Sequence, residues 1–317
     1  MDKSLKDEQY ITKAIALARK GEGAVSPNPL VGAIIVKNGS IIGRGYHKRF
    51  GTEHAEINAF KDADKKGNKN KLVGSTLYVT LEPCCHWGNT PPCVDEIIKR
   101  KIKRVVIAHK DQNPLINGKG TNKLRIHGIK VDLGVLEEEA KKLNYPFLKY
   151  MRTQMPFVIL KMGISLDGKI THPKKRYITN KKSLDYVHHI RNSVDAILVG
   201  HNTYKKDKPR LTTRLKGGKN PRPVVLPKSK TDLTKLLKHL GKEQVTSILV
   251  EGGQETATSF LNHNLVDKVY LFLAPEFFGG GELAMFGKLD KIVKLKNIHV
   301  EKLDENIMIS GYVKQNR

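Results

Sequence analysis

All three cysteines of this chain lie in one short stretch, which runs from Glu82 to Cys93 and also holds the single tryptophan. Cys84, Cys85 and Cys93 are grouped so closely that they favour a metal site over a disulfide framework. Free thiols of this kind are typical of a reducing compartment, so we expect a cytoplasmic protein. The rest of the sequence is therefore interpreted around this stretch.

A histidine, His54, lies two residues before a carboxylate, Glu56, upstream of the cysteines. A hydrolytic Zn²⁺ needs three protein ligands and an open position for a water molecule, whose pKa it lowers to about 7. His54, Cys84 and Cys93 are the expected ligands, because they supply one imidazole and two thiolates. Glu56 is the expected catalytic residue, since its carboxylate can take a proton from the water and pass it on.

Two alternatives stay open at this site. Cys84 is preferred to Cys85 as a ligand because it directly follows Pro83, and zinc content of variants at the two positions would decide between them. The other alternative is a structural zinc ion, which normally has four protein ligands; Cys85 and His86 are available for that purpose. The presence of Glu56 in the expected place favours a catalytic ion.

The whole arrangement resembles the zinc-dependent nucleoside and base deaminases, in which one His and two Cys hold the ion and a Glu moves protons. Deaminases acting on tRNA or free bases usually show two cysteines two residues apart, whereas eight residues separate Cys84 from Cys93. With the motifs at 28–32, 80–84, 90–93 and 111–114, this spacing resembles the deaminase domain of the bifunctional riboflavin biosynthesis enzymes.

That resemblance implies deamination of a diaminopyrimidinone carrying a ribosylamino 5′-phosphate. It also implies that Asn28, His47 and His86 line the substrate pocket. Two positions depart from the family pattern: Cys85 stands where Ser is usual, and Asn89 stands where a basic residue is usual. The second departure affects a position expected to contact the substrate.

Apolar periodicity and turn residues predict an α/β fold with two domains, the first over 1–150 and the second over 151–317. A linker is expected at 151–156 and a basic loop at 204–214. Helices are expected at 8–20, 53–63, 92–101, 121–126, 137–143, 180–192, 232–240 and 256–261. Strands are expected at 31–37, 40–46, 75–80, 104–109, 130–134, 157–162, 196–200, 223–226, 247–250, 268–274, 292–299 and 307–313. Asn38-Gly39 predicts a hairpin between the first two strands.

The resemblance continues through the second half, and it implies a dihydrofolate-reductase-like α/β domain that binds NADPH and reduces the ribosyl group to ribityl. The first half is correspondingly expected to be a cytidine-deaminase-like α/β/α domain. The residues implied for the cofactor are Gly163, Tyr177, Thr179, Thr203, Asp207, Gly252 and Gly253. The residues implied for the reductase substrate are Lys161, Asp167, Arg191, Leu211, Arg214 and Glu251.

Residue chemistry supports parts of this assignment. Arg191 and Arg214 suit a phosphate, because guanidinium groups bind it through two hydrogen bonds. Gly252 and Gly253 follow a strand and precede a helix, where backbone N–H groups can meet a phosphate. Lys161 and Asp167 have an alternative interpretation as ordinary charges at a strand end.

Between 226 and 232 the chain is shorter than the family pattern, which usually has an Asp after the strand and further strands before Glu251. Tyr177 also stands where Trp is usual. The missing segment would help to hold the cofactor. A deaminase with an impaired second domain is therefore a specific alternative.

Lysine and arginine outnumber aspartate and glutamate by 57 to 31, which gives a formal net charge of +26. This excess raises two further alternatives, a nucleic-acid (tRNA) deaminase and a non-catalytic RNA-binding protein with a structural zinc ion. The lysines are scattered and only 6% of residues are aromatic, so a solvated surface is favoured over a nucleic-acid interface. No apolar run is long enough for a membrane, no signal peptide is expected, and a homo-oligomer stays open.

Overall fold

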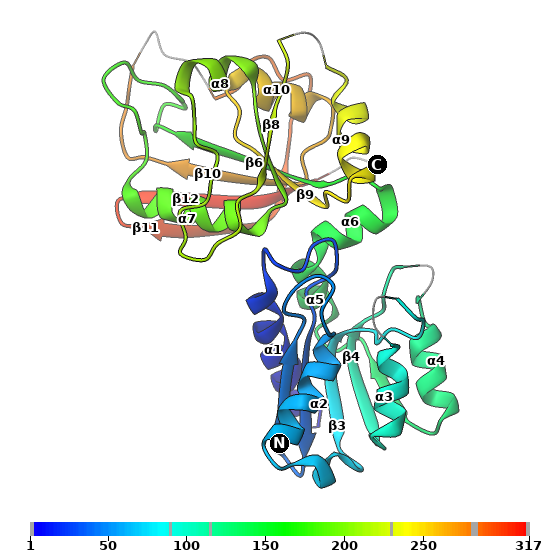
Figure 1. The fold of residues 1–317 in the computed structure, drawn as a ribbon. Coiled ribbons are helices and arrows are strands. Elements are labelled where there is room, and N and C mark those ends of the chain that lie inside the picture. Colours follow the sequence, from blue (N-terminus) through cyan, green and yellow to red (C-terminus); the bar gives the residue numbers. More distant parts are fainter. Residues whose placement is uncertain (1–2, 89–90, 114–115, 229–230, 280–284, 315–317) are drawn as a thin grey trace. The chain divides into compact units, whose positions relative to one another are not determined.

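The computed structural model describes residues 3–88, 91–113, 116–228, 231–279 and 285–314. The chain forms two compact units, Met1–Thr153 and Gln154–Arg317. Each unit is built around one β-sheet with helices packed against it (Figure 1). The α/β class expected for both halves is confirmed.

The first unit contains a five-stranded sheet in the order β2-β1-β3-β4-β5. β1 runs antiparallel to β2 and β3, whereas β3, β4 and β5 are parallel. The strands are β1 (Gly32–Lys37), β2 (Ser40–Tyr46), β3 (Thr76–Leu81), β4 (Arg104–His109) and β5 (Lys130–Leu133). The expected hairpin is confirmed: Asn38 and Gly39 join β1 to β2 with φ values of 49° and 79°, as a tight turn of this kind requires.

Helices cover both faces of this sheet, which makes a three-layer α/β/α unit (Figure 1). α1 and α5 share one apolar core with the sheet, and α2, α3 and α4 share the other. The helices are α1 (Lys3–Ala18), α2 (Ala55–Lys65), α3 (Cys93–Lys99), α4 (Lys119–Ile126), α5 (Glu137–Leu143) and α6 (Tyr145–Thr153), with short 3₁₀ turns at Arg19–Gly21 and Lys69–Leu72.

Two glycines of β2 bring α2 unusually close to the sheet. A Cβ at Gly43 would lie 2.5 Å from the carbonyl oxygen of Ala59, and one at Gly45 would lie 2.2 Å from that of Ala55. Only hydrogen fits in either place. The start of α2, which carries His54 and Glu56, is thereby pressed against the sheet.

The second unit contains a seven-stranded sheet in the order β11-β12-β10-β6-β9-β7-β8. The five strands from β10 to β8 are parallel, and β12 runs antiparallel to both of its neighbours. The strands are β6 (Phe157–Ile164), β7 (Ala196–Val199), β8 (Arg222–Val225), β9 (Ser247–Val250), β10 (Lys268–Leu273), β11 (Leu295–Leu303) and β12 (Asn306–Val313).

The helices of the second unit are α7 (Lys181–Ser193), α8 (His201–Asp207), α9 (Leu233–Lys242) and α10 (Gln254–Asn262). Side chains of α9 and α10 pack into one apolar core with β6, β7 and β9. α7 packs on the opposite face, where the ring of Tyr186 contacts those of Tyr270 and Phe272. This opposite face is the one on which the polar residues of β6 and β9 gather.

Two sequence expectations are wrong in this region. The stretch 151–156 was expected to be a linker, but α6 extends to Thr153. Pro146 occupies the first turn of α6, where a missing N–H costs nothing. The expected loop at 204–214 begins within α8, a short helix that was not predicted.

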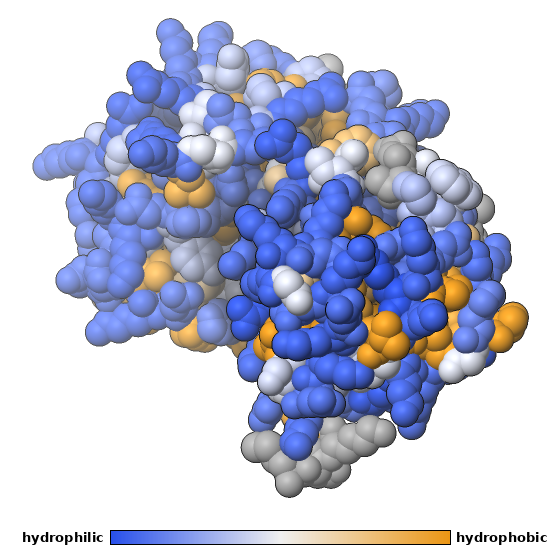
Figure 2. Space-filling view, turned by 60° about the horizontal axis from the view of Figure 1, so that its bottom comes forward, coloured by the Kyte–Doolittle hydropathy of each residue, from blue (hydrophilic) through white to orange (hydrophobic). Residues whose placement is uncertain are grey.

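Within the described residues, no helix combines the length and apolarity needed to cross a membrane. Hydrophilic residues cover most of the face seen in Figure 2, and apolar residues appear between them in smaller groups.

A buried ion-pair network ties α1 to the sheet of the first unit. Asp7, which is only 6% exposed, accepts hydrogen bonds from the hydroxyl of Tyr78 at 2.8 Å and from Arg104 at 2.8 and 2.6 Å. Arg104 also donates to Asp132 at 2.5 Å. The network links α1, β3, β4 and β5.

We predict that Asp7→Ala lowers the free energy of unfolding of the first unit by about 2–4 kcal/mol, because it leaves the Tyr78 hydroxyl without its partner and the half-buried Arg104 with Asp132 alone. Hydrogen–deuterium exchange of the β3 and β4 amides in the full chain measures the effect. Gln9→Ala, at an exposed position of the same helix, is the control. Equal exchange in both variants would contradict the prediction.

Candidate active sites

Three side chains from three elements meet in the first unit. His54 is the residue before α2, Cys84 lies in the loop after β3, and Cys93 begins α3. Their ligand atoms all lie within 4.8 Å of one another. His54 Nδ1 is 3.2 Å from Cys93 Sγ and 3.5 Å from Cys84 Sγ, and the backbone N–H of Cys93 donates to Cys84 Sγ at 3.3 Å.

This group fits a zinc ion. Zn–N and Zn–S bonds of about 2.0 and 2.3 Å in a tetrahedral site place neighbouring N and S ligand atoms roughly 3.5 Å apart, close to the separations observed. Among the described residues, no fourth His, Cys, Asp or Glu joins the group, which leaves one position for a water molecule. Cys85 instead packs against the apolar core between the sheet and α2.

The pKa values of the two cysteine thiols shift in opposite directions. The pKa of Cys84 falls to about 4, because Cys93 donates a hydrogen bond to its sulfur and His54 adds a second. The pKa of Cys93 is raised, because its proton is held by Cys84 and burial adds to the effect. A divalent cation that takes the place of the shared proton would satisfy both sulfurs.

Glu56 lies in the first turn of α2 and is 3% exposed. Burial raises its pKa to about 7, although the neighbouring His54 opposes this shift. A carboxyl group in such surroundings can both accept and give up a proton near neutral pH. Its place two residues from His54 puts this proton carrier beside the three candidate ligands.

His47 and Asn28 lie next to the same group. The ring of His47 stands edge-on to that of His54 at 5.6 Å between centroids. Its Nε2 is 3.2 Å from Asn28 Nδ2, and its Nδ1 is 3.0 Å from the carbonyl oxygen of Glu53. Because an amide nitrogen can only donate, Nε2 accepts and the ring proton is assigned to Nδ1. His47 is thus neutral, in keeping with a pKa lowered by burial.

The loop between the two cysteines holds the remaining expected contact. Nδ1 of His86 is buried and finds no hydrogen-bond partner within the described part of the chain. Trp87, the next residue, is 74% exposed. Asn89, whose departure from the family pattern was noted, lies outside the described residues.

Glu82 is an organising residue that the sequence did not reveal. Its buried carboxylate accepts hydrogen bonds from three backbone N–H groups, those of Gly118 and Thr121 at 2.9 Å and that of Asp111 at 3.3 Å. It thereby fastens Asp111 and the start of α4 to the end of β3. The sequence placed Glu82 in the motif at 80–84 but gave no indication of these partners.

The loop held by Glu82 covers the cysteines. Ile116 packs against Cys84 and Cys93 in a small apolar cluster. Gly120 allows this close approach, since a Cβ there would lie 2.2 Å from the carbonyl oxygen of Pro83. The sulfur atoms therefore have an apolar wall on one side.

In the second unit, glycines gather where β7 and β9 end. A Cβ at Gly200 would lie 2.6 Å from Thr256 Oγ1, and one at Gly252 would lie 2.4 Å from Thr256 Cβ. Thr256, on α10, therefore seats that helix tightly against both strand ends. Gly253 directly precedes α10, and its backbone approaches Thr203. Backbone N–H groups at such a helix start suit the phosphates of a dinucleotide, so these residues fit NADPH.

The other expected cofactor residues are more dispersed. Gly163 lies on β6 against Thr179. Tyr177 is 51% exposed and carries the guanidinium of Arg176 over its ring. Asp207 is exposed at the end of α8.

A buried group of charges lies on the α7 face of the sheet. Glu251 accepts from Arg191 at both carboxylate oxygens, each at 2.8 Å, and pairs with Lys161 at 3.2 Å. Burial acts to raise the pKa of Glu251, but Lys161 and Arg191 outweigh it and hold that pKa at about 2. The carboxylate is therefore charged, and it neutralises much of the field of the two cations.

Arg191 is expected to bind a phosphate, and the structure shows how its guanidinium is held. Nε and Nη2 each donate to Glu251, and Nη1 donates to the carbonyl oxygen of Thr212, which leaves two of its five N–H groups. Arg214 is exposed, and no ion pair to it is found in the described part of the chain. Arg214 is therefore a second cation available for a phosphate.

Asp167 and Leu211 each help to fix the course of the backbone around them. The carboxylate of Asp167 accepts from Ser165 Oγ at 2.5 Å and from the backbone N–H groups of Phe278 and Gly279 at 3.1 and 2.9 Å. These hydrogen bonds hold the turn after β6 to the loop 276–279. Leu211 is buried with φ at +44°, so it bends the chain ahead of Arg214.

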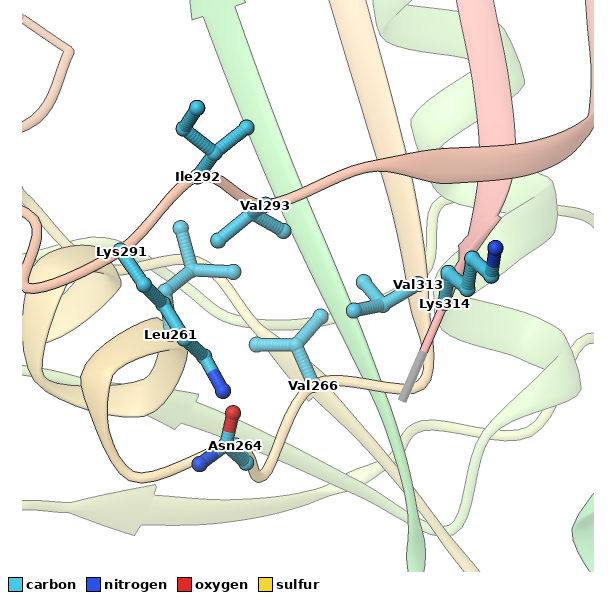
Figure 3. Close-up of a pocket in the computed structure, with 8 residues that line it drawn as sticks. All are labelled: Leu261, Asn264, Val266, Lys291, Ile292, Val293, Val313 and Lys314. Carbon is cyan, nitrogen blue, oxygen red and sulfur yellow. The ribbon is translucent and has the colours of Figure 1, made fainter. Parts of the chain in front are cut away.

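A separate hollow in the second unit lies near the end of α10 (Figure 3). It is lined mainly by aliphatic side chains, with two lysines and an asparagine at its rim, and measures about 20 Å³. That space suits about one water molecule. The hollow has none of the titratable acids, cysteines or histidines that a catalytic site would need.

Comparison with known families gives two matches. Residues 4–109 match the cytidine and deoxycytidylate deaminase zinc-binding region. Residues 156–234 and 224–309 match the RibD C-terminal domain in two overlapping pieces. The overlap falls where the chain passes from β8 to α9.

Relatives cover nearly the whole chain. The riboflavin biosynthesis protein RibD of Aquifex aeolicus is 38% identical over 351 aligned residues, which cover 96% of this chain and 97% of that protein. The RibD protein of Escherichia coli is 34% identical and covers 87% of this chain and 89% of its own length. A crystal structure of the diaminohydroxyphosphoribosylaminopyrimidine deaminase/5-amino-6-(5-phosphoribosylamino)uracil reductase of Thermotoga maritima superposes with a TM-score of 0.91 at 38% identity, covering 99% of this chain and all of that one.

We predict that Glu82→Gln speeds the release of zinc to a chromophoric chelator by about tenfold to a hundredfold, because its amide group would face N–H donors and loosen the loop over the cysteines. Glu96→Gln, whose carboxylate pairs with Arg100 at the end of α3, is the matched control. Equal release rates from the two variants would show that the clamp has no effect on the metal.

Proposed function

Because the chain belongs to the family of the bifunctional riboflavin biosynthesis protein RibD, we propose which of its residues carry the two reactions of that family. The protein is a zinc-dependent deaminase and an NADPH-dependent reductase, with a cytidine-deaminase-like domain followed by a dihydrofolate-reductase-like one. The observation that carries the assignment is the group of His54, Cys84 and Cys93 beside the buried Glu56.

In the first reaction, a 2,5-diamino-6-ribosylamino-4(3H)-pyrimidinone 5′-phosphate loses an amino group as ammonia. Zinc, held by His54, Cys84 and Cys93, supplies a water molecule of lowered pKa when bound. Glu56 takes one proton from the water and delivers it to the pyrimidine ring nitrogen; it then takes the remaining proton of the added hydroxyl and delivers it to the amine, which departs as ammonia. The water oxygen becomes the new carbonyl oxygen of the ring.

Asn28, His47 and His86 orient the pyrimidine. His47 holds the Asn28 amide in place through their shared hydrogen bond, so Asn28 can present its carbonyl oxygen to the ring substituents. His86 offers a buried Nδ1 that needs a partner, which a polar atom of the substrate can supply.

In the second reaction, the ribosyl group is reduced to ribityl after the sugar ring opens to an imine. NADPH supplies the hydride when bound. The backbone N–H groups of Gly252 and Gly253 bind its phosphates at the start of α10, with Thr203 beside them. The rest of the cofactor site consists of Gly163, Tyr177, Thr179 and Asp207. Lys161, Glu251 and Arg191 form a group of paired charges that lines the substrate site, and Arg214 binds the substrate phosphate. Asp167 and Leu211 shape the loops around it.

We infer that the segment after β8 is shortened relative to the family. β8 is the last strand of its sheet, and its residues are largely exposed. An alignment of 351 residues to the Aquifex protein exceeds this 317-residue chain, so the relative contains residues that this chain lacks. Fewer contacts to NADPH follow, so we expect a weak cofactor affinity, which a binding titration measures.

The alternative of a tRNA deaminase is not favoured. Eight residues separate Cys84 from Cys93, and a reductase unit has no place in tRNA editing. We further propose that the enzyme acts in the cytoplasm, where its three free thiols stay reduced, and that its positive charge attracts phosphorylated small molecules rather than nucleic acid.

Both activities are tested in one assay with purified protein, the pyrimidinone phosphate and NADPH. We expect ammonia release followed by NADPH oxidation. Ammonia without NADPH oxidation would mean that the second unit is impaired. No ammonia together with tight tRNA binding would overturn the deaminase assignment.

We predict that Glu56→Gln lowers the rate of ammonia release about 10²- to 10⁴-fold, because it removes the proton carrier while keeping the side chain's shape. Metal analysis should find zinc still bound, since Glu56 is not a ligand. Glu96→Gln serves as the control. Turnover at the normal rate in Glu56→Gln would remove this residue from the mechanism.

We predict that Gly252→Ala weakens NADPH binding roughly tenfold or more, because the new Cβ would collide with Thr256 and push α10 away from the strand ends. Titration of NADPH fluorescence measures this directly. A second change, Thr256→Gly, removes the colliding atoms and should restore binding in part. Gly287→Ala, where a Cβ would have its nearest neighbour at 3.5 Å, is the control. Unchanged affinity in Gly252→Ala would contradict the proposed cofactor site.

A further inference from the structure

His188, on α7, is a buried polar residue without an assigned role. The residue is only 8% exposed, and its Nδ1 atom is enclosed with no hydrogen-bond partner in the described part of the chain. Nε2 is not enclosed in this way, and no hydrogen bond to it is found among the described residues either. Because Nδ1 is enclosed by the protein, Nε2 is the ring nitrogen that a partner from outside the chain can reach.

The surroundings of His188 point toward a ligand. His188 and Arg191 lie one turn apart on α7 and therefore on one side of the helix. The segment 212–214 is fastened there twice: Thr213 Oγ1 donates to the carbonyl oxygen of His188 at 3.0 Å, and Arg191 donates to that of Thr212 at 3.1 Å. Arg214 follows directly, so its free guanidinium emerges beside His188.

The proton of the neutral imidazole is assigned to Nε2. Burial lowers the pKa of His188, and Arg191 and Arg214 lower it further, against opposing effects of Asp185 and Glu251. A buried N–H without an acceptor is rarer in proteins than a buried acceptor without a donor, which places the proton on the nitrogen that is not enclosed. His188 therefore presents an Nε2–H donor next to an unneutralised arginine.

The charges around this donor favour an anion. Lys161, Arg191 and Arg214 are three cations; Glu251 pairs with two of them, and Asp185 is a second carboxylate that acts on His188. The local sum is close to one positive charge. A phosphate monoester is an anion with three acceptor oxygens, so it suits this positive site and its two donors.

We propose that His188 and Arg214 together bind the phosphate group of the reductase substrate, with His188 Nε2–H and the Arg214 guanidinium donating to different phosphate oxygens. This inference rests on the proposed reductase function. It makes His188 a residue that selects phosphorylated over unphosphorylated substrate.

The test compares 5-amino-6-ribosylaminouracil with and without its 5′-phosphate as reductase substrates. His188→Asn removes the donor from the position of Nε2 and should raise the KM for the phosphorylated substrate about tenfold or more, with kcat changed little. The KM for the unphosphorylated substrate should stay the same. His188→Gln keeps an N–H near the position of Nε2 and should retain most of the affinity.

His189→Ala is the matched control, since His189 is the neighbouring residue on α7 and is exposed. The double variant of His188→Asn and Arg214→Ala should lose less than the two single effects combined, because both side chains hold one group. Equal KM increases for both substrates in His188→Asn, or an equal loss in His188→Gln, would overturn the proposal. So would an unchanged KM.

A binding measurement separates failure of this proposal from failure of the reductase function. The ¹⁵N resonances of His188 should shift when the phosphorylated ribityl product is added and should not shift with the unphosphorylated product. If wild-type protein oxidises no NADPH but this shift occurs, the phosphate site stands and the reductase function does not. The absence of a shift at saturating phosphorylated product would refute the role of His188.

Discussion

The deaminase unit depends on one constraint: three ligand atoms from three separate elements must meet within coordination distance. His54 precedes α2, Cys84 follows β3 and Cys93 begins α3, so no one element can set the geometry alone. The glycines of β2 press the start of α2 against the sheet, and the carboxylate of Glu82 fastens a distant loop beside the cysteines. The packing of the backbone therefore places the three ligand atoms within coordination distance.

The same packing gives Glu56 its chemical character. A carboxyl group on an exposed helix would be ionised at neutral pH, but Glu56 is buried, which raises its pKa to about 7. The apolar wall formed by Ile116 keeps solvent from the sulfurs on one side. Fold and reactivity are therefore linked, because the contacts that bring the ligands together also bury the proton carrier.

Features set by local sequence were predictable, and features set by distant contacts were not. The hairpin at Asn38-Gly39 and the group of His54, Cys84 and Cys93 followed from spacing and turn chemistry. Glu82 was missed because its partners lie 29, 36 and 39 residues further along the chain. The ion pair of Arg191 was not foreseen either, because its partner Glu251 lies 60 residues away. Helix α8 was missed because its polar, lysine-rich sequence lacks an apolar face.

The central claim is that two of the three cysteines and one histidine bind a catalytic zinc ion. X-ray absorption at the zinc edge of the purified protein tests it most directly. A site formed by His54, Cys84, Cys93 and water predicts two sulfur ligands at about 2.3 Å and two lighter ligands at about 2.0 Å, one from His54 and one from water. Three sulfur ligands would place Cys85 on the metal, close the site to water and contradict the account.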